Sequence, residues 1–575
     1  MTELKWWQRA VFYQIYPRSF ADGNGDGIGD FPGMIQKLDY LQDLGIDAVW
    51  LSPHYPSPQY DCGYDITDYK GIAPEYGTLS DFNRFIAGAH QRGIRVILDL
   101  VLNHTSHEHP WFIESRSSRH YPKRNWYVWK DGKVDDNGVL QPPNNWNSTF
   151  DGIAWEFDPP TNQYYYHYFF KQQPDLNWRN PEVKREMWDS VRFWLDLGVD
   201  GFRLDAISTI FEHPEVPEHP LDMSLASLRR VLRDTRTPEA HAQARQLQKL
   251  MFQYQNHQPG LHELMQELRS VIDEYDDCVL VAEDDDIAYM GNGENELHLV
   301  FNFPLMRTSR LTPAWVRANQ KERLTRLAPI SPSAWPCNTL GNHDSPRVYS
   351  HFGDGKNDQQ LARISLALML TLRGTPFLYY GEEIGMTDYY LEHIDDFRDL
   401  LGTWQYQAEI DEFGTPPDLA LQYAAKITRD KNRTPMQWEN SPNAGFSPVN
   451  VRTWLPVNTN YDSGVNVADQ SADPASLLNF YQRMLSLRKN NPALIEGDYL
   501  PLHEHSDDYL AFLRRAEHQT CLVVLNMVAK YLHIHLDLEG VSAQLLFSSR
   551  RRSASLLNLD SVHLFPFEII IAEIK

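Results

Sequence analysis

Cysteine is scarce in this chain, and the few cysteines present form no metal-binding or redox pair. The four of them, Cys62, Cys278, Cys337 and Cys521, are scattered through 575 residues without any CxxC spacing. A disulfide framework and a zinc site are therefore not expected. This usage is typical of a protein from a reducing cytoplasm.

Long apolar runs are also missing. No stretch approaches the roughly 20 apolar residues that a membrane helix needs. The opening residues, MTELKWWQRA, lack the basic and apolar regions of a signal peptide. We therefore expect a cytoplasmic protein that does not have a membrane as a partner.

Basic residues are outnumbered by acidic ones. The chain has 53 Lys and Arg against 77 Asp and Glu, a formal net charge of −24. This argues against nucleic acid and anionic membrane surfaces as partners. Aromatic residues, in contrast, are abundant, with 16 Trp, 29 Tyr and 26 Phe. Aromatic rings pack on the C–H face of sugars, so carbohydrate binding is one interpretation, and an aromatic-rich core is an equally good one.

Short apolar runs alternate with amphipathic, helix-like segments over most of the chain. The candidate strands are residues 10–17, 47–52, 95–101, 200–205, 278–283, 298–303, 337–342 and 376–381. Their hydrophobicity is continuous, which is typical of parallel strands buried on both faces. Eight such units predict an α/β fold, a (β/α)8 TIM barrel. A doubly wound sheet is the alternative, but no GxGxxG motif follows the first run.

Several segments interrupt or follow this alternation. Residues 104–172 are rich in Trp, Tyr, Asn and Pro and predict a lobe inserted after strand 3, while residues 211–262 and about 386–465 lengthen two later connections. Beyond about residue 495, short alternating runs predict a C-terminal antiparallel β domain. We therefore divide the chain into a first part of the barrel (1–103), an inserted domain (104–172), a second part of the barrel (173–494) and a C-terminal β domain (495–575).

Charged and polar residues recur where the predicted strands end. They are Asp99 with Asn103 and His104, Arg203 with Asp205, Glu283, and His343 with Asp344. A single aspartate after an apolar run is more often a helix cap than a catalytic group. Four such strand ends in one chain argue against that explanation, because catalytic groups of a barrel gather at these ends. Several carboxylates together with histidines and an arginine are the groups that glycoside chemistry uses.

Six ordered motifs carry a resemblance to a known family. They are DLVLNHTS (99–106), QPDLN (173–177), GFRLDAI (201–207), VLVAE (279–283), LGNHDSPR (340–347) and GTPFLYYGEEIGM (374–386). From about residue 5 to its C-terminus, the chain resembles the alpha-amylase family of glycoside hydrolases, and within it the oligo-1,6-glucosidase and alpha-glucosidase group. One departure is Ala282, where most members have glycine. Relatives of the trehalose synthase type also carry alanine there, so the subgroup stays open.

The resemblance implies roles for three carboxylates. Asp205 would be the nucleophile that forms a covalent glucosyl-enzyme, with Arg203 favouring its ionised form. Glu283 would be the general acid and then the general base, which requires a raised pKa in the free enzyme. Asp344 would grip ring hydroxyls and distort the sugar. Retention of configuration implies that the carboxyl groups of Asp205 and Glu283 lie about 5–5.5 Å apart.

The same resemblance implies a pocket for one terminal glucose. His104 and His343 would hydrogen-bond the hydroxyls of the ring that Asp344 holds. In the segment DCGYDITDY (61–69), Asp61 and Tyr64 would close the pocket and so impose exo-action. The alternative for this segment is an aromatic turn without a binding role.

Two further pairs of residues are candidates for contact with the sugar. The segment RDKNRTPMQW (429–438) would place Arg429 and Arg433 near the sugar. Their alternative is a surface arginine with a solvated head, which is favoured more for Arg429 than for Arg433. Phe150 and Phe169 would line the acceptor side, although structural packing is the favoured explanation for each taken singly.

Linkage preference has one indication in the sequence. Within the resembling group, the residue after the nucleophile tends to be Val in α-1,6-specific members and Thr or Ala in α-1,4-preferring ones. Here it is Ala206, which favours maltose-type α-1,4 substrates. The arginine-rich loop motif of sucrose isomerases is not found between Glu283 and the NHD segment.

The loop DGNGDGIGD (22–30) places oxygen-bearing side chains between glycines. An EF-hand would need Glu at its twelfth position, which is Gly33, and a phosphate loop would need Gly-Lys-Ser/Thr. The resemblance implies a Ca²⁺ or Mg²⁺ site, with ligands from Asp22, Asn24, Asp26, the Ile28 carbonyl and Asp30. The cation would be structural, and no organic cofactor is expected. The alternative is a glycine-rich turn with solvated acids.

These observations converge on a retaining, exo-acting alpha-glucosidase that takes small alpha-glucosides, with transglucosylation as a further expected activity, and that exists as a monomer or homodimer. The alternative is a glucosyl-transferring or isomerising enzyme of the trehalose synthase or sucrose isomerase type. A non-catalytic barrel, as in the heavy chains of amino-acid transporters, is disfavoured because the chain carries the full set of carboxylates.

Overall fold

Eight parallel strands form the centre of the computed structural model, which describes residues 3–538, 542–552 and 555–575. In chain order they are β1 (Phe12–Ile15), β2 (Ala48–Leu51), β3 (Arg95–Val101), β9 (Gly201–Asp205), β10 (Val279–Ala282), β11 (Leu299–Val300), β12 (Cys337–Thr339) and β13 (Thr375–Tyr379). The sheet order is β11-β10-β9-β3-β2-β1-β13-β12, and a parallel bridge between Phe301 and Cys337 joins its two ends. Each of the eight apolar runs contains one strand, except that β13 begins at Thr375, one residue before its run, so the predicted barrel is confirmed.

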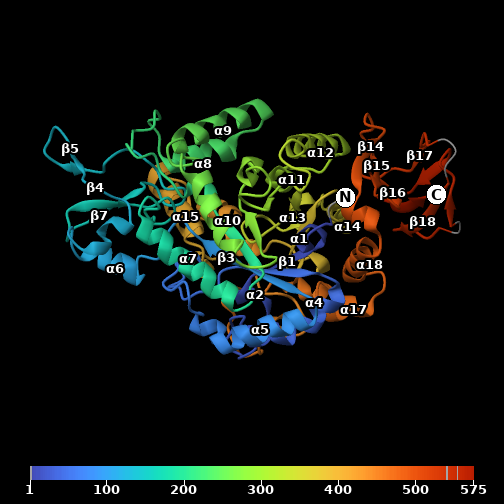
Figure 1. The fold of residues 1–575 in the computed structure, drawn as a ribbon, viewed down its shortest axis with the longest axis horizontal. Coiled ribbons are helices and arrows are strands. Elements are labelled where there is room, and N and C mark those ends of the chain that lie inside the picture. Colours follow the sequence, from blue (N-terminus) through green and yellow to red (C-terminus); the bar gives the residue numbers. More distant parts are fainter. Residues whose placement is uncertain (1–2, 539–541, 553–554) are drawn as a thin grey trace.

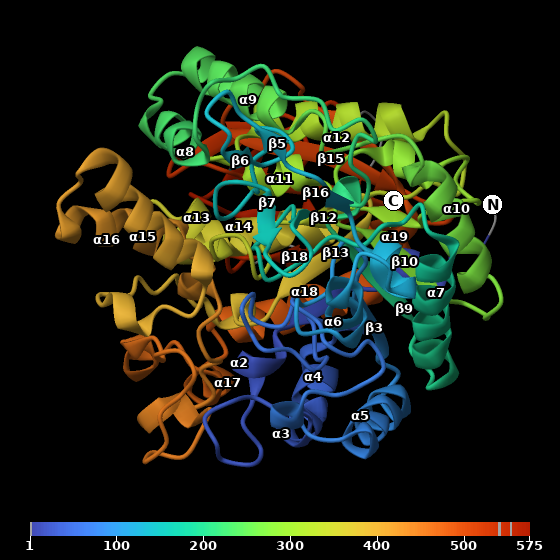
Figure 2. The ribbon, with the colours of Figure 1, turned by 90° about the vertical axis from the view of Figure 1, so that its left-hand side faces the viewer.

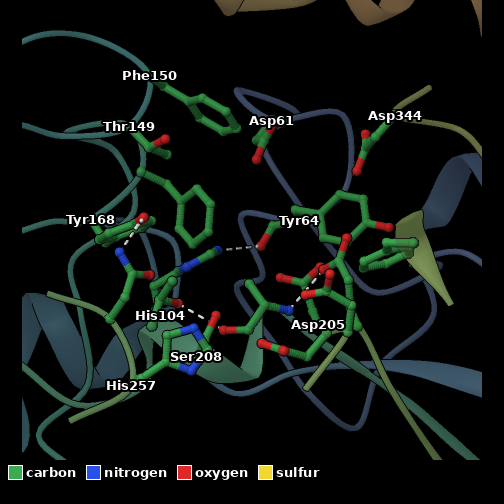
Figure 3. A pocket seen from close by; sticks show the side chains of 18 of the residues that line it. Asp61, Tyr64, His104, Thr149, Phe150, Tyr168, Asp205, Ser208, His257 and Asp344 are labelled. Carbon is green, nitrogen blue, oxygen red and sulfur yellow. Dashed lines mark hydrogen bonds between the residues drawn. The ribbon is translucent and has the colours of Figure 1, made fainter. Parts of the chain in front are cut away.

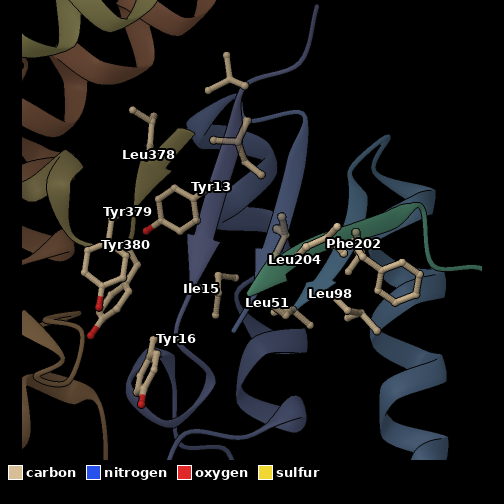
Figure 4. Packing of buried hydrophobic residues seen from close by; sticks show 14 of the residues in the cluster. Tyr13, Ile15, Tyr16, Leu51, Leu98, Phe202, Leu204, Leu378, Tyr379 and Tyr380 are labelled. Atoms are coloured by element: carbon tan, nitrogen blue, oxygen red, sulfur yellow. The ribbon is translucent and has the colours of Figure 1, made fainter. Parts of the chain in front are cut away.

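Alternate residues of each strand are buried on opposite faces of the sheet. Phe12 and Phe377 belong to a cluster inside the barrel, where their rings stack at 4.3 Å. Tyr13, Ile15 and Leu51 belong to the larger cluster on the other face (Figure 4). Because both faces of the sheet are covered, neither set of alternating side chains is exposed to water. The strand sequences are therefore continuously apolar.

Helices surround the barrel (Figures 1 and 2). They include α4 (Leu38–Leu44), α5 (Leu79–Gln91), α7 (Pro181–Asp196), α10 (Leu261–Ile272), α12 (Pro313–Leu327), α14 (Asp358–Thr371) and α18 (Leu477–Lys489). In α5, Thr78 and Asp81 form a capping box at the N-terminus. The buried side chains of that helix, Phe82, Phe85 and Ala89, recur at helical spacing and turn one face to the core.

Two excursions meet at one end of the barrel. The lobe after β3 contains α6 (Pro110–Ser117), a sheet of β4 (Trp129–Lys130), β8 (Gln163–Tyr166) and β7 (Trp155–Asp158), and the pair β5 (Lys133–Val134) and β6 (Leu140–Gln141). The connection after β9 carries α8 (Leu225–Asp234) and α9 (Pro238–Phe252). Trp155 of the lobe shares a buried cluster with Leu228 and Phe252 of that connection. Together with α15 (Leu400–Phe413) and α16 (Pro417–Ile427), these segments stand over the end of the barrel where the site lies (Figure 2).

The C-terminal residues form an antiparallel sheet at the opposite end of the molecule (Figure 1). Its order is β14 (Asp498–Leu502), β15 (Tyr509–Arg515), β16 (Thr520–Asn526), β21 (Ile569–Ile574), β18 (Ala543–Ser548) and β19 (Leu556–Leu557), and β17 (Leu532–Ile534) pairs separately with β20 (Val562–Leu564). The predicted β domain is confirmed, while its limits and those of the inserted lobe stay predictions. All four cysteines are buried and unpaired. Within the described ranges, no helix is long and apolar enough to cross a membrane.

Candidate active site

A cavity of 470 Å³ lies beside the C-terminal ends of the barrel strands. Figure 3 shows the side chains that surround it. Ten of the residues expected from the sequence line it, namely Asp61, Tyr64, His104, Phe150, Phe169, Asp205, Ala206, Glu283, Asp344 and Arg429. Three more, Arg203, His343 and Arg433, are fully buried behind these residues. The loop of residues 22–30 does not line the cavity.

Arg203 holds three carboxylates together. It stands two residues before Asp205 on β9, so both side chains point to the same face of the strand. Its Nη1 lies 2.7 Å from Asp99 Oδ1 and 2.8 Å from Asp205 Oδ1, and its Nη2 lies 2.9 Å from Glu283 Oε1. The other oxygen of Glu283 accepts a hydrogen bond of 2.8 Å from the Ala206 amide. The two expected catalytic carboxylates therefore flank a single guanidinium.

Burial dominates the protonation of Asp205. Removal from water and the nearby charges of Glu283 and Asp99 raise the pKa of Asp205 well above its ordinary value, and Arg203 opposes this shift. We expected Arg203 to favour the ionised form. The arginine acts in that direction, but burial outweighs it. At Asp99, burial likewise outweighs the opposing charge of Arg203 and raises the pKa to about 6.

Asp344 is in the opposite situation. Burial disfavours its ionised form, but His343, Arg433 and Arg429 outweigh burial and hold the pKa of Asp344 well below the usual range. Because burial also lowers the pKa of His343 well below its ordinary value, the imidazole is neutral near pH 7. The guanidiniums therefore supply the stabilising charge, with Arg433 Nη2 at 2.6 Å and Arg429 Nη1 at 3.8 Å from Asp344 Oδ1.

The two expected histidines are held by protein groups. His343 Nε2 lies 2.5 Å from the Tyr64 hydroxyl, and the two rings stack in parallel at 5.4 Å. His104 Nε2 lies 2.9 Å from the side-chain amide of Gln173, which also donates to Asp61 Oδ2 at 2.9 Å. His104 reaches the cavity, whereas His343 does not. Gln173 belongs to the QPDLN motif, but no role was expected for it from the sequence.

Arg429 lines the cavity on the side of Asp61, Tyr64 and Asp344, the end that the sequence predicts to be closed. Its Nη2 lies 2.6 Å from Asp61 Oδ1 and 2.6 Å from Asp399 Oδ1. Arg429 is 7% exposed and Arg433 is 0% exposed, so the alternative of surface arginines with solvated heads is wrong for both. Asp399 was missed, because no motif marks it and it reaches the site only through the long connection after β13.

The lining of the cavity includes aromatic rings and carboxylates. Phe150 and Phe169 lie 5.3 Å apart, and the guanidinium of Arg429 is 4.9 Å from the Phe150 ring centre. Both rings line the cavity, and their role on the acceptor side stays a prediction. Further lining residues were not expected from the sequence: they include Ser208, Asn256, His257, Asp284 and Asp285.

The loop of residues 22–30 offers hard oxygen ligands that are turned onto its own backbone. Asp22 accepts hydrogen bonds from the amides of Gly25 and Gly27, and Asp30 accepts from those of Gly23, Asn24 and Gly33. In the parts of the chain that the structure describes, no group of three or more His, Cys, Asp or Glu residues is arranged to hold a metal. The oxygen chemistry suits Ca²⁺ or Mg²⁺, and the cation site stays a prediction.

Comparison with known proteins gives a consistent result. The family model described as alpha amylase, catalytic domain, matches residues 14–497. The chain is 40% identical to an oligo-1,6-glucosidase of Parageobacillus thermoglucosidasius, over 92% of this chain and 91% of that protein. It is 41% identical to an oligo-1,6-glucosidase of Heyndrickxia coagulans, over 92% of each. Among solved structures, the trehalulose synthase MutB of Pseudomonas mesoacidophila MX-45 superimposes with a TM-score of 0.87 at 38% identity, over 100% of both chains.

Proposed function

Because the chain belongs to the alpha-amylase family and is a glycoside hydrolase, we propose that it is a retaining, exo-acting alpha-glucosidase. It releases terminal glucose from short alpha-glucosides. The observation that carries this proposal is the contact of one guanidinium, that of Arg203, with both Asp205 and Glu283 beside the cavity.

The chemistry follows from these two carboxylates. The reacting form is the one in which the proton resides on Glu283 and Asp205, paired with Arg203, is ionised. In this form Glu283 donates its proton to the glycosidic oxygen while Asp205 attacks the anomeric carbon, so that the leaving sugar departs and a covalent glucosyl-enzyme forms. Glu283 then removes a proton from water, which attacks the same carbon and frees Asp205. Two inversions give net retention of configuration. Arg203 balances the charge that moves between the two carboxylates.

Exo-action is supported by the closed end of the cavity. The ion pair of Asp61 with Arg429 and the stacked pair of Tyr64 with His343 are buried there, and in this proposal they block the space beyond one sugar ring. Asp344, kept ionised by Arg433 and Arg429, is suited to accept hydrogen bonds from two ring hydroxyls. A chain that extended past this end would displace buried ion pairs, which is costly.

For linkage, we propose a preference for α-1,4 bonds as in maltose. Ala206 follows the nucleophile and lines the cavity, so its methyl group leaves room beside the leaving sugar. The relatives named above are oligo-1,6-glucosidases, which makes isomaltose the necessary competitor. Location in the cytoplasm and a monomeric or homodimeric state also remain part of the proposal.

The test is product analysis of the purified enzyme on maltose, isomaltose, sucrose and trehalose, each given separately. We expect free glucose as the dominant product, with kcat/KM for maltose at least ~3-fold above that for isomaltose, within the range that aglycone contacts control. A higher value for isomaltose would overturn the linkage preference. Failure to release glucose from any of the four would overturn the function.

A second candidate is a glucosyl-transferring or isomerising enzyme on the same scaffold. The full-length likeness to a trehalulose synthase favours it. In this case a sugar rather than water attacks the glucosyl-enzyme, and Glu283 activates a hydroxyl of that sugar. An isomer or longer oligosaccharide from sucrose or maltose, with little free glucose, would establish this alternative.

A further inference from the structure

His257 stands at the rim of the catalytic cavity in an unusual backbone conformation. It lies on the connection between α9 and α10 and lines the cavity together with its neighbour Asn256. Its φ is +53°, a left-handed value that residues other than glycine rarely adopt. Such strain persists only where the surroundings hold it, and it gathers at binding sites.

Two contacts hold His257 in place. Its amide donates to the carbonyl of Ser208 at 2.7 Å, three residues after the expected nucleophile Asp205. Its ring Nδ1 lies 2.6 Å from the hydroxyl of Tyr289, and the two rings are nearly parallel, at 9°. The backbone of His257 is thereby fixed to the segment that follows Asp205, and its imidazole is fixed to the segment that follows Glu283.

These contacts leave the second ring nitrogen available. Burial raises the pKa of Tyr289, so its phenol stays protonated and can donate to Nδ1. In the neutral imidazole the proton then resides on Nε2, which becomes a hydrogen-bond donor. Among the described residues, none hydrogen-bonds to Nε2, and none donates to the side-chain oxygen of Asn256. A donor and an acceptor therefore stand side by side at the cavity rim.

The position of His257 relates it to the leaving sugar rather than to the terminal glucose. Figure 3 shows His257 and Ser208 on the side of the cavity away from Asp61 and Asp344. Since the proposed function places the terminal glucose at Asp61 and Asp344, a disaccharide bound there would extend its second ring toward the opposite side, where His257 lies. A paired donor and acceptor match the neighbouring hydroxyls of such a ring.

We propose that His257, with Asn256, binds hydroxyl groups of the leaving or acceptor sugar and so favours sugar aglycones over aryl aglycones. This inference rests on the proposed function. It gives the long connection of residues 211–262 a role in substrate choice. In a transfer reaction, the same two residues would bind the acceptor sugar that attacks the glucosyl-enzyme in place of water.

The experiment compares maltose with 4-nitrophenyl α-glucoside in steady-state kinetics of His257→Ala. We expect the KM for maltose to rise by ~10-fold with little change in kcat, and kcat/KM for the aryl glucoside to stay within ~2-fold. His257→Asn, which tolerates the positive φ and retains a donor, should recover part of the maltose KM. The matched control is His262→Ala. His262 packs on Tyr289 at 5.2 Å and pairs with Glu296 but does not line the cavity.

Several outcomes would overturn the inference. They are equal losses on both substrates, an unchanged maltose KM, or the same effect from His262→Ala. If His257→Ala does not fold, as judged by circular dichroism, His257→Asn and Tyr289→Phe decide the matter, because each should raise the maltose KM selectively. Failure of the proposed function is recognised separately, since the unmodified enzyme would then release no glucose from either substrate.

Discussion

Arg429 Nη2 lies 2.6 Å from Asp61 Oδ1, although 368 residues separate the two in the chain. The same guanidinium also holds Asp399, so segments after two different barrel strands are tied together at the closed end of the cavity. All three side chains are buried, and removal of one partner would leave the others uncompensated. The closed end is therefore a single electrostatic unit.

The first prediction concerns this unit. Arg429→Lys should raise the KM for maltose by at least ~10-fold, because an ammonium cannot bridge two carboxylates as a guanidinium does. Initial rates against maltose concentration measure the change. Arg452→Lys is the control, since Arg452 forms an exposed ion pair with Asp396. An unchanged KM in Arg429→Lys would show that the ion pair does not shape the sugar pocket.

The second prediction concerns the nucleophile. Asp205→Asn should lower kcat by more than ~10⁴-fold while maltose still binds, because the covalent intermediate can no longer form. Turnover of 4-nitrophenyl α-glucoside and calorimetric titration with maltose measure the two quantities. Asp43→Asn, a change at an exposed position on α4, should leave both unaltered. Turnover near that of the unmodified enzyme would remove Asp205 from its role.

The third prediction links Asp205 to stability. Its folded-state pKa is raised by burial and by Glu283, so the folded protein holds a proton that the unfolded chain releases more readily. The resulting penalty is absent below the unfolded pKa of about 4 and grows as the pH rises from there through the folded pKa. Asp205→Asn should therefore raise the melting temperature at pH 7 and leave it nearly unchanged at pH 4. If the variant and the unmodified protein had the same melting temperature at pH 7 as well as at pH 4, this account would be contradicted.

The sequence was sufficient to predict the barrel and the carboxylates that meet beside its cavity. Strands buried on both faces leave continuous apolar runs, and the residues at their ends, such as Asp205 and Glu283, follow directly. It was not sufficient for Asp399 and His257. Both sit on long connections, and their positions depend on how those connections pack rather than on local pattern. The balance between burial and Arg203 at Asp205 likewise depends on solvent exclusion, which one-dimensional spacing does not reveal.

The fourth prediction tests the cation loop. If Ca²⁺ or Mg²⁺ binds there, millimolar Ca²⁺ should raise the melting temperature by ~2 °C or more relative to a chelator, because a ligand that binds only the folded state stabilises it. Asp26→Asn should abolish the shift. Asp30 is unsuitable for substitution, since it caps α3 (Phe31–Gln36) by accepting from the Gly33 amide. The absence of a shift with either cation would favour the glycine-rich turn with solvated acids.

The fifth prediction concerns linkage and the residue after the nucleophile. Ala206 has φ +42° and ψ +44°, a left-handed conformation in which a β-branched side chain is strained. Ala206→Val should therefore lower the melting temperature and, by narrowing the space beside the leaving sugar, lower kcat/KM for maltose relative to isomaltose by ~5-fold or more. Ala206→Gly is the matched control, because glycine adopts this conformation freely and leaves the space open. It should retain both the stability and the preference for maltose. A maltose-to-isomaltose ratio that is the same in the valine and glycine variants would show that the side chain at this position does not select the linkage.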